Sequence, residues 1–238
     1  MAPWRAIDSL HDLRAAVEAL GCPIVLKTRR FGYDGKGQAW IRSEVDITAA
    51  WDAIKGKPAV AEAAVDFAAE FSVIVARWAD GRHSFWDSPE NAHRDGILHR
   101  STVPCGEACA SQVATARASA LRIAEALDHV GVLTVEFFAS GTGPIVNEIA
   151  PRVHNSGHWT IEGAVTSQFE QHIRAICDLP PGSAETLGAG ASMENLIGSD
   201  VDRWPELVGD QRAHVHLYGK GEARPGRKMG HVTWLRLR

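Results

Sequence analysis

Residues that could hold a phosphate stand near the N-terminus. Positions 32–38 read Gly-Tyr-Asp-Gly-Lys-Gly-Gln. The backbone N–H groups of such a glycine-rich turn, together with the Lys36 ammonium, can bind an anion, for which phosphate is the natural guest. The spacing matches neither a P-loop nor GxGxxG, so a plain hairpin turn is the alternative interpretation. Lys27 favours the anion site, because a lysine that ends a buried strand needs an anionic partner.

Two glutamates could bind a metal ion. Glu136 and Glu148 lie on predicted strands at 132–138 and 144–150. Because side chains alternate along a strand, a connecting loop of three or five residues would place the two carboxylates opposite each other. At ~4 Å and an effective dielectric of ~20 they would repel by roughly 4 kcal/mol, which a magnesium ion would offset. One carboxylate turned to solvent is the alternative. The same register predicts an apolar opposite face, interrupted only by Asn147 and made of Leu133, Val135, Phe137, Ile145 and Ile149.

A polar segment follows the second of these strands. Residues 151–159 read Pro-Arg-Val-His-Asn-Ser-Gly-His-Trp. His154 and His158 are four residues apart, a spacing that binds zinc on a helix, but the glycine and the Asn-Ser pair between them disfavour a helix. No third ligand is nearby. We therefore favour a loop in which Arg152, Asn155 and the histidines contact an anion, with an ordinary capped loop as the alternative.

A second group of cations stands near the C-terminus. Lys220, Arg224, Arg227 and Lys228 surround a Pro-Gly pair. Such a density of cations in an acidic chain predicts a local phosphate-binding patch. A solvated basic turn is the alternative.

Composition limits the class of protein. The 238 residues carry a formal charge of −4, which excludes a basic nucleic-acid-binding surface over the whole chain. The chain has neither an apolar run of about 18 residues nor a signal-peptide core, so we expect no membrane contact. The four cysteines lack CxxC spacing, which disfavours a zinc ribbon or a disulfide framework and favours a reducing, cytoplasmic compartment.

The elements predicted around these residues mix helices with antiparallel strands, which indicates an α+β fold. Helical spacing predicts helices over 10–20, 44–54, 108–127 and 162–177. Three short apolar runs after a linker at 179–182 predict a small β-rich appendage. Strands are expected at 23–27, 39–41, 59–63, 70–77, 84–91, 132–138 and 144–150, and the short runs are 193–197, 213–217 and 231–235.

These strings together resemble the ATP-grasp superfamily, and within it the 5-(carboxyamino)imidazole ribonucleotide synthase family. The resemblance runs from about residue 4 to about residue 234. Its most specific motifs are HNSGHWT (154–160) and RPGRK (224–228). Further support comes from GYDGKGQ (32–38), NEIAPR (147–152), TSQFEQH (166–172) and NLIGSD (195–200).

The resemblance implies an ATP-grasp fold of two α+β subdomains with the β-rich appendage. The small subdomain would be 1–65, the large subdomain with the metal and acceptor site 66–180, and the C-terminal domain 181–238. The implied protein is a cytoplasmic ligase of purine synthesis that requires ATP and Mg²⁺. ATP, bicarbonate and aminoimidazole ribonucleotide would give the N-carboxylated ribonucleotide, ADP and phosphate through carboxyphosphate. No nucleic acid or membrane is expected as a partner, and formation of a homodimer is left open.

The resemblance also implies roles for particular residues. Phosphoryl transfer would proceed by positioning and charge neutralisation, with Arg152, Lys27 and Lys36 as the catalytic cations. Phosphate contacts are implied for Lys27, Gly32, Tyr33, Asp34, Gly35, Lys36, Gly37 and Gln38; adenine contacts for Glu62, Ala63, Ala64 and Val65; and contacts around the ribose for Glu70 and His93. Magnesium ligands would be Glu136 and Glu148, with Asn147 adjacent, and acceptor contacts would come from Arg152, Asn155, Ser156, His158, Lys220 and Arg227.

The chain departs from the family pattern in four places. Family members carry an N-terminal α/β domain of roughly one hundred residues before the segment that matches here, and they continue past the strand at 231–235, so we expect a shortened chain. Phe31 stands where the family usually has glycine, and Asp87 where it usually has proline. Two alternatives stay open: another ATP-grasp ligase, such as a formate-using glycinamide ribonucleotide enzyme, and a remnant that binds nucleotide or a partner without turnover.

Overall fold

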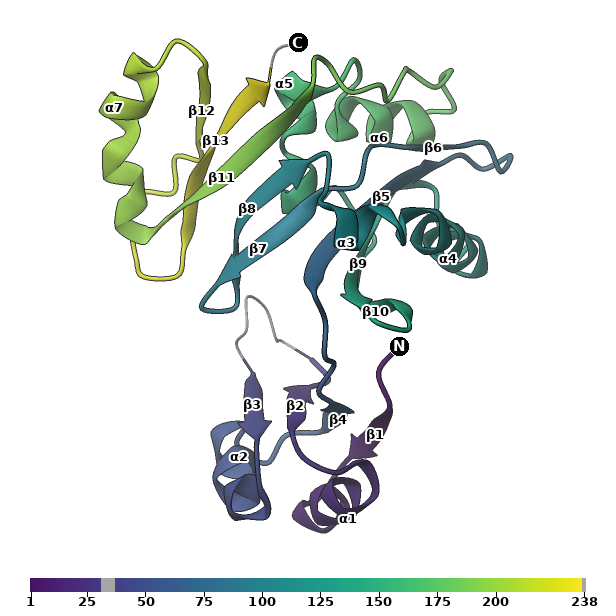
Figure 1. Ribbon diagram of the computed structural model, residues 1–238, viewed down its shortest axis with the longest axis vertical. Coiled ribbons are helices and arrows are strands. Elements are labelled where there is room, and N and C mark those ends of the chain that lie inside the picture. Colours follow the sequence, from purple (N-terminus) through teal and green to yellow (C-terminus); the bar gives the residue numbers. More distant parts are fainter. Residues whose placement is uncertain (31–36, 237–238) are drawn as a thin grey trace. The chain divides into compact units, whose positions relative to one another are not determined.

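The computed structural model describes residues 1–30 and 37–236, which fold into two compact units (Figure 1). The first unit comprises Met1–Asp66 and Asp95–Ile97, and the second comprises Phe67–Arg94 and Leu98–Arg238. Each unit has its own sheet and its own hydrophobic core. In the described part of the chain, no helix combines the length and apolar character that crossing a bilayer requires.

The first unit is a four-stranded antiparallel sheet with two helices. Its strand order is β1-β4-β2-β3. Apolar side chains from the sheet and helices, among them Leu13, Ile24 and Ile41, are fully buried in one core. The elements are β1 (Trp4–Ile7), α1 (Leu10–Leu20), β2 (Ile24–Thr28), β3 (Gln38–Ile41), α2 (Ile47–Ala53) and β4 (Ala59–Ala63).

Local side-chain hydrogen bonds decide where these two helices begin. The Ser9 hydroxyl accepts the Asp12 N–H at 3.1 Å, as expected of an N-cap, and the predicted helix 10–20 is confirmed. The predicted helix 44–54 begins differently. The Asp46 carboxylate accepts the N–H groups of Arg42 and Ser43 at 2.9 and 3.0 Å. These bonds accompany a 3₁₀ turn, and α2 begins only after it.

The second unit is built on a nine-stranded sheet. Its strand order is β10-β9-β5-β7-β8-β11-β13-β12, and β6 pairs with β5 outside this path. The strands are β5 (Ala69–Arg77), β6 (His83–Phe85), β7 (Glu90–Arg94), β8 (Ile97–Val103), β9 (Gly131–Ser140), β10 (Gly143–Ala150), β11 (Gly190–Ile197), β12 (Ala213–Leu217) and β13 (Lys228–Arg236). Its helices are α3 (Glu107–Ala110), α4 (Val113–Ala126), α5 (Thr160–Gly163), α6 (Gln168–Ile176) and α7 (Trp204–Gly209).

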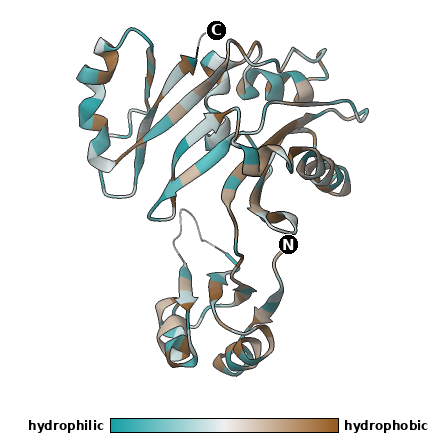
Figure 2. Ribbon diagram, in the orientation of Figure 1, coloured by the Kyte–Doolittle hydropathy of each residue, from teal (hydrophilic) through white to brown (hydrophobic). Residues whose placement is uncertain are grey.

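Helices cover both faces of the central strands β5 and β9. Because side chains alternate along a strand, Val73 and Val135 pack with Ala116 and Ala120 of α4 on one face. Figure 2 shows β5 mostly brown, whereas β7 and β8 carry more teal. The opposite face packs against the segment that leads into α6 and against α6 itself, in a cluster that includes Ile74, Ala76, Val132, Trp159 and Ala175.

Two predicted helices are interrupted in the structure. The predicted helix 108–127 is divided into α3 and α4 by Ser111 and Gln112. The predicted helix 162–177 is wrong at residues 164–167, between α5 and α6, where Ala164 pairs with Thr186 as an isolated β-bridge. The Ser167 hydroxyl then caps α6 by accepting the Glu170 N–H at 3.2 Å.

The division into parts 1–65, 66–180 and 181–238 stays a proposal. The compact units divide the chain near residue 66. The strands of the third part continue the large sheet, because β11 pairs with β8 on one side and with β13 on the other. The proposed C-terminal part is therefore joined to the second unit through backbone hydrogen bonds.

A matched pair of leucines tests the core of the second unit. Leu133 on β9 is fully buried, whereas Leu127 after α4 is 58% exposed. We expect Leu133→Ala to lower the free energy of unfolding by about 3 kcal/mol, because apolar contact is lost and a cavity is left. Leu127→Ala should change it by less than about 0.5 kcal/mol. Urea unfolding followed by tryptophan fluorescence measures both; equal effects would contradict the assignment of Leu133 to the core.

Candidate active site

Glu136 and Glu148 face each other across the β9–β10 hairpin. They are direct cross-strand partners, so this prediction is confirmed. The predicted reason is wrong, because a two-residue turn, Gly141–Thr142, joins the strands rather than an odd-numbered loop. A β-bulge at Asn147 inserts one extra residue and restores the facing register. The predicted apolar face is also corrected. Val146, and not Ile145, lies opposite Phe137 and packs on that core.

The environment of Glu136 disfavours its negative charge. Its side chain is 13% exposed, and its Oε1 lies 3.4 Å from His154 Nε2. Burial, reinforced by the charge of Glu148, raises the pKa of Glu136 to about 7, although His93 and Lys228 act in the opposite direction. The Thr134 hydroxyl on the same strand face is buried without a hydrogen-bond partner among the described residues. A divalent cation fits this site, since it favours carboxylate oxygens and would offset their repulsion.

His154 faces Glu136 as a neutral ring. Burial and the charge of Arg152 lower the pKa of His154 to about 3. Its Nδ1 accepts the Ser156 N–H at 3.3 Å and lies 2.8 Å from the Ser156 hydroxyl. We therefore assign the ring proton to Nε2, which is the atom nearest Glu136. The amide of Gln168 holds the backbone of His154 from both sides, at 2.9 and 2.7 Å.

The loop after β10 does not form the helix that a zinc pair would need. Residues 155–157 form a 3₁₀ turn, and His154 and His158 have separate partners. Gly157 permits close packing on the sheet, because an added Cβ would lie 2.7 Å from Ile74 Cδ1. Among the described residues, no three His, Cys, Asp or Glu side chains are grouped to hold a metal ion. The carboxylate pair would therefore complete a magnesium site with phosphate oxygens and water.

The acceptor-side residues of the prediction come together in the second unit. Asn155 and Asn195 form a reciprocal amide pair at 2.8 and 2.6 Å. His158 Nδ1 lies 3.1 Å from the Tyr218 hydroxyl, which lies 2.8 Å from His231 Nδ1. Burial and the neighbouring histidine charges lower the pKa of His231 to about 3. Burial, His216 and nearby cations lower the pKa of His158 to about 4. Both rings are neutral at physiological pH.

Sequence reasoning missed four residues of this neighbourhood: Gln168, Asn195, Tyr218 and His231. Three of them are buried polar side chains, and Tyr218 bridges the half-buried His158 and the buried His231. A signal was available only for Asn195, a polar residue that follows the apolar Ala191 and Met193 in the alternation along β11. Nothing in their spacing connects them with residues 154–158.

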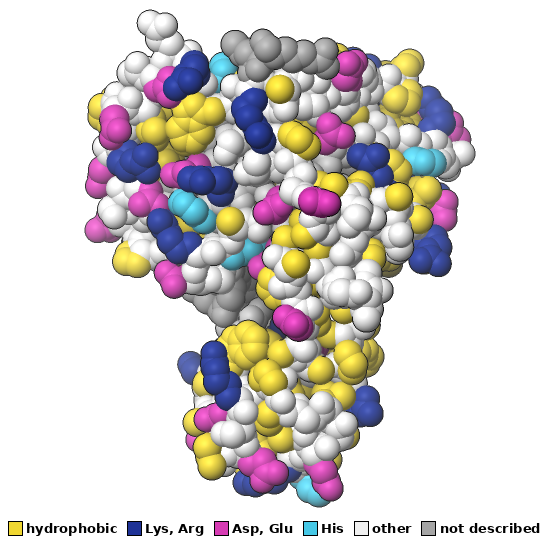
Figure 3. Space-filling view, viewed as in Figure 1, with side chains coloured by type: hydrophobic (Ala, Val, Ile, Leu, Met, Phe, Trp, Pro, Cys, Tyr) yellow, Lys and Arg dark blue, Asp and Glu magenta, His cyan; other side chains and the backbone are white. Residues whose placement is uncertain are grey.

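The predicted basic patch lies on the hairpin from β12 to β13. Lys220 Nζ donates to the Lys228 carbonyl at 2.9 Å and lies 4.9 Å from the Tyr218 ring centroid. The Arg227 N–H donates to the Arg224 carbonyl at 3.0 Å, which closes the turn. Figure 3 shows dark blue side chains interspersed with magenta ones over the region of α7 and β11–β13. Lys220 and Tyr218 thus connect this hairpin with His158.

Another predicted pair lies on the neighbouring strands β5 and β7. His93 Nδ1 lies 3.3 Å from Glu70 Oε1, and each side chain is about one-fifth exposed. Burial acts to lower the pKa of His93, but the hydrogen bond and charge of Glu70 outweigh it and raise the pKa. Asn91, the cross-strand partner of Glu70, bonds the hydroxyls of Ser72 and Ser101 at 2.7 and 2.8 Å. This buried chain of hydrogen bonds fixes β7 between its neighbours.

The first unit carries the remaining predicted residues. Lys27 Nζ forms a 2.7 Å ion pair with Glu62, so the anionic partner expected for Lys27 is supplied by the chain itself. The N–H groups of Ala63 and Ala64 donate to backbone carbonyls of the same unit, and Val65 is half-buried. Gln38 is the cross-strand partner of Lys27, and the Gly37 carbonyl accepts the Thr28 N–H at 2.9 Å. Gly32, Tyr33, Asp34, Gly35 and Lys36 lie outside the described residues.

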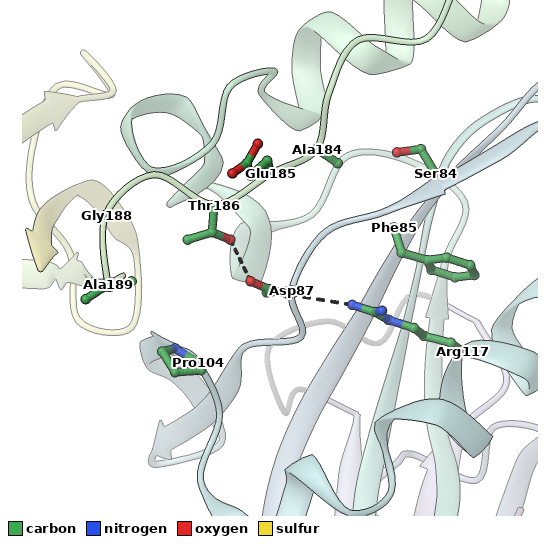
Figure 4. A pocket seen from close by; sticks show the side chains of 11 residues that line it. Ser84, Phe85, Asp87, Pro104, Arg117, Ala184, Glu185, Thr186, Gly188 and Ala189 are labelled. Carbon is green, nitrogen blue, oxygen red and sulfur yellow. Dashed lines mark hydrogen bonds and ion pairs between the residues drawn. The ribbon is translucent and has the colours of Figure 1, made fainter. Parts of the chain in front are cut away.

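A cavity of about 610 Å³ lies elsewhere in the second unit. Figure 4 shows Asp87 directed toward Thr186 and Arg117. The Thr186 hydroxyl donates to Asp87 at 2.8 Å, and Arg117 lies 3.8 Å from the same carboxylate. These contacts explain how an aspartate is accommodated where the resembled family usually has proline. None of the residues lining this cavity is one of the predicted site residues.

Comparisons with known proteins agree with this architecture. Residues 1–169 match the ATP-grasp domain family, and residues 191–237 match the phosphoribosylaminoimidazole carboxylase C-terminal domain family. N5-carboxyaminoimidazole ribonucleotide synthase of Brucella melitensis is 48% identical, over 100% of this chain and 66% of the relative. Its counterpart in Bacillus subtilis is 42% identical, over 99% of this chain and 62% of the relative.

The solved structures to which this chain is similar include synthases of the same kind. The N5-carboxyaminoimidazole ribonucleotide synthetase of Thermus thermophilus aligns with a TM-score of 0.89 at 43% identity, over 99% of this chain and 63% of that chain. The Aspergillus clavatus synthase, in complex with ADP and 5-aminoimidazole ribonucleotide, aligns with a TM-score of 0.91 at 33% identity, over 100% of this chain and 64% of that chain. The chain thus spans about two thirds of the length of the relatives it matches.

The two α+β units and the facing carboxylates define an ATP-grasp protein, which confirms the predicted fold class. Two further findings identify the family within this class: the match to the C-terminal domain family, and relatives that align with almost the whole of this chain. The chain belongs to the N5-carboxyaminoimidazole ribonucleotide synthase family.

The raised pKa of Glu136 makes stability depend on pH. A carboxyl group whose pKa rises from 4.5 unfolded to about 7 folded stabilises the protein below the lower value, and that contribution is lost as the pH rises through the upper one. In magnesium-free buffer with a chelator, we expect Glu136→Gln to increase the free energy of unfolding by about 2 kcal/mol at about pH 8, and to give no comparable gain at about pH 4.

Chemical denaturation at the two pH values measures this difference. Glu125→Gln, at an exposed position of α4, is the matched control and should have little effect at either pH. A gain from Glu136→Gln that is equal at both pH values would contradict a raised pKa.

Proposed function

We propose that this chain carries out the ATP-dependent carboxylation of 5-aminoimidazole ribonucleotide with bicarbonate, in the cytoplasm. The observation that carries the proposal is the facing pair of Glu136 and Glu148 beside the His154–His158 loop, in a chain of this family. Because the chain spans about two thirds of the relatives' length, its activity, substrates and compartment are all part of the proposal.

The proposed reaction has two steps. A bicarbonate oxygen takes the γ-phosphoryl group of ATP, which forms carboxyphosphate and releases ADP. The amino nitrogen of the ribonucleotide then forms a bond to the carbonyl carbon, phosphate leaves, and the nitrogen loses a proton. Both steps move negative charge between small molecules, so the protein has to supply position and compensating charge rather than a nucleophile.

The residues expected to contact the nucleotide include the Lys27–Glu62 ion pair of the first unit. They also include Glu70 and His93, which pair with each other in the second unit. Glu136 and Glu148 would bind Mg²⁺, which when bound neutralises phosphate charge. The expected phosphate-contacting set is Lys27 with Gly32–Gln38, including Lys36, and the expected adenine-contacting set is Glu62, Ala63, Ala64 and Val65.

The acceptor would be held by the loop after β10 and by the β12–β13 hairpin. Arg152 is exposed, and its Nη1 donates a 2.8 Å hydrogen bond to the adjacent Val153 carbonyl, so its guanidinium has further N–H donors for a phosphoryl group. Asn155, Ser156 and His158 would form a polar wall held in place by hydrogen bonds to the buried Asn195 and to the half-buried His154 and Tyr218. Lys220 and Arg227 would contact the ribonucleotide phosphate.

The metal assignment predicts the effect of removing one carboxylate. Glu148→Gln should weaken magnesium-dependent nucleotide binding by about tenfold or more, because one anionic ligand is lost while the shape is kept. Titration calorimetry with ATP, with and without Mg²⁺, measures this. Glu125→Gln is the control and should bind as the unmodified chain does. If the dependence on Mg²⁺ is unchanged in Glu148→Gln, the cation is held elsewhere.

Arg152 provides the test of the reaction itself. The assay measures ADP and carboxylated ribonucleotide formed from ATP, bicarbonate and 5-aminoimidazole ribonucleotide. We expect Arg152→Ala to reduce turnover by on the order of 10²-fold, about 3 kcal/mol, while ATP affinity changes much less. ADP formation that does not respond to the ribonucleotide, or that responds instead to glycinamide ribonucleotide with formate, would overturn the proposed substrate. Equal losses in turnover and in ATP affinity would indicate that Arg152 contributes only to binding of the ground state.

A further inference from the structure

The half-buried ring of His158 is hydrogen-bonded through one of its two nitrogens. Among the described residues, Nδ1 makes both hydrogen-bond contacts of the ring, at 3.3 Å from Asn155 Nδ2 and at 3.1 Å from the Tyr218 hydroxyl. The two nitrogens of a neutral imidazole differ, because one carries the proton and the other accepts a hydrogen bond. The contacts of Nδ1 therefore decide what Nε2 can offer to a ligand.

A ladder of amides fixes the orientation of the Asn155 side chain. Asn195 Nδ2 donates to the backbone carbonyl of Leu98 at 2.9 Å, which distinguishes the nitrogen of that amide from its oxygen. The Asn195 oxygen then accepts from Asn155 Nδ2 at 2.8 Å, and the Asn155 oxygen accepts from Asn195 Nδ2 at 2.6 Å. The nitrogen of Asn155 is consequently the atom that faces His158. Because an amide nitrogen only donates, His158 Nδ1 is an acceptor and carries no proton.

The buried partner of Tyr218 leads to the same assignment. His231 is 2% exposed, and its Nδ1 lies 2.8 Å from the Tyr218 hydroxyl, whereas its Nε2 is buried without a partner among the described residues. A buried N–H without an acceptor is rarer than a buried acceptor without a donor. The proton of His231 therefore belongs on Nδ1, where it donates to the Tyr218 oxygen. The Tyr218 O–H is then available to His158 Nδ1.

The ionisable groups around His158 keep its ring neutral. Burial is the largest cause that lowers the pKa of His158 to about 4, and the charges of His216 and of three basic side chains act in the same direction. His216 Nε2 lies 2.5 Å from Glu162 Oε1, and its ring is stacked on His231 with the centroids 4.5 Å apart. The three basic side chains are Lys228, Arg152 and Lys220. A neutral ring with an unprotonated Nδ1 carries its proton on Nε2.

We propose that His158 is a fixed, neutral hydrogen-bond donor whose Nε2–H binds an oxyanion in the acceptor site. Asn195, Tyr218 and His231 are positioning residues, because they hold the ring in this tautomer. The oxyanion is a carboxylate or phosphate oxygen of the reacting molecules, and for their identity the proposal rests on the proposed function. His158 does not act as a base, because Nε2 already carries a proton and Nδ1 already accepts from two donors.

Two substitutions of His158 distinguish a donor from a base. His158→Gln supplies an amide N–H in place of Nε2–H but has no basic nitrogen, whereas His158→Leu supplies neither group. In the carboxylation assay we expect His158→Gln to keep turnover within about tenfold of the unmodified chain, and His158→Leu to lose on the order of 10²-fold. A rise in KM for bicarbonate or for the ribonucleotide identifies the molecule that carries the oxyanion. Equal losses of turnover in the two variants would overturn the donor role.

Nuclear magnetic resonance of the full chain with isotope-labelled histidine tests the tautomer independently of the reaction. Long-range proton–nitrogen correlations at neutral pH distinguish a ring protonated on Nδ1 from one protonated on Nε2. We expect His158 to be protonated on Nε2 and the adjacent His231 on Nδ1, with signals assigned by their loss in His158→Gln and His231→Gln. A proton on His158 Nδ1 would overturn the proposal even in an active chain. The expected tautomers in a chain that forms no carboxylated product would uphold the assignment and overturn the proposed function instead.

Asn195 provides the test of the amide ladder. Asn195→Leu removes the ladder at similar size, so Asn155 is free to turn and His158 should show both tautomers. Gln171→Leu is the matched control for lost stability, because it removes a different buried amide, which bonds Gly182 through both its oxygen and its nitrogen. We expect turnover to fall by about tenfold in Asn195→Leu, with an unchanged KM for ATP, and to stay unchanged in Gln171→Leu. If the His158 signals of Asn195→Leu match those of the unmodified chain, Asn195 is not a positioning residue.

Discussion

The candidate site depends on one unfavourable interaction, the approach of two carboxylates across the β9–β10 hairpin. Glu136 and Glu148 are cross-strand partners, and the first of them is buried enough for its pKa to rise to about 7. A folded protein rarely retains such a pair without a compensating ligand. Several nearby groups are arranged around this repulsion: His93 and Lys228 lower the pKa of Glu136, and the neutral His154 lies against it.

A scaffold of buried amides holds the loop that carries the other polar groups. Gln168 fixes the backbone of His154, and Asn195 forms a reciprocal pair with Asn155. These amides come from α6 and from β11, which belongs to the segment that matches the C-terminal domain family. The loop therefore takes its shape from two distant parts of the chain. Such satisfied polar networks are rigid, because each member would be costly to leave unpaired.

The same helix connects the site with the surface. On the inward side of α6, Gln168 hydrogen-bonds the backbone of His154 and Gln171 hydrogen-bonds that of Gly182. The apolar residues of the helix therefore face outward. The orientation of α6 that stabilises the loop therefore leaves Phe169, Ile173 and Ile176 partly exposed.

The sequence by itself determined the α+β class and the family, because alternation along a strand and motif spacing are local properties. It predicted the facing carboxylates correctly, but from a loop length that the structure does not have. The N-cap hydrogen bond of Ser9 also made the start of α1 predictable. Other features were decided by tertiary structure. The register of the hairpin depends on a bulge at Asn147, which no loop-length rule contains. The start of α6 depends on a bridge from Ala164 to Thr186, and the partner of Lys27 is Glu62, which is 35 residues away. Tyr218, His231 and Asn195 joined the site only because the β11–β13 strands extend the large sheet, and contacts between residues so far apart in the chain leave no periodic signal in the sequence.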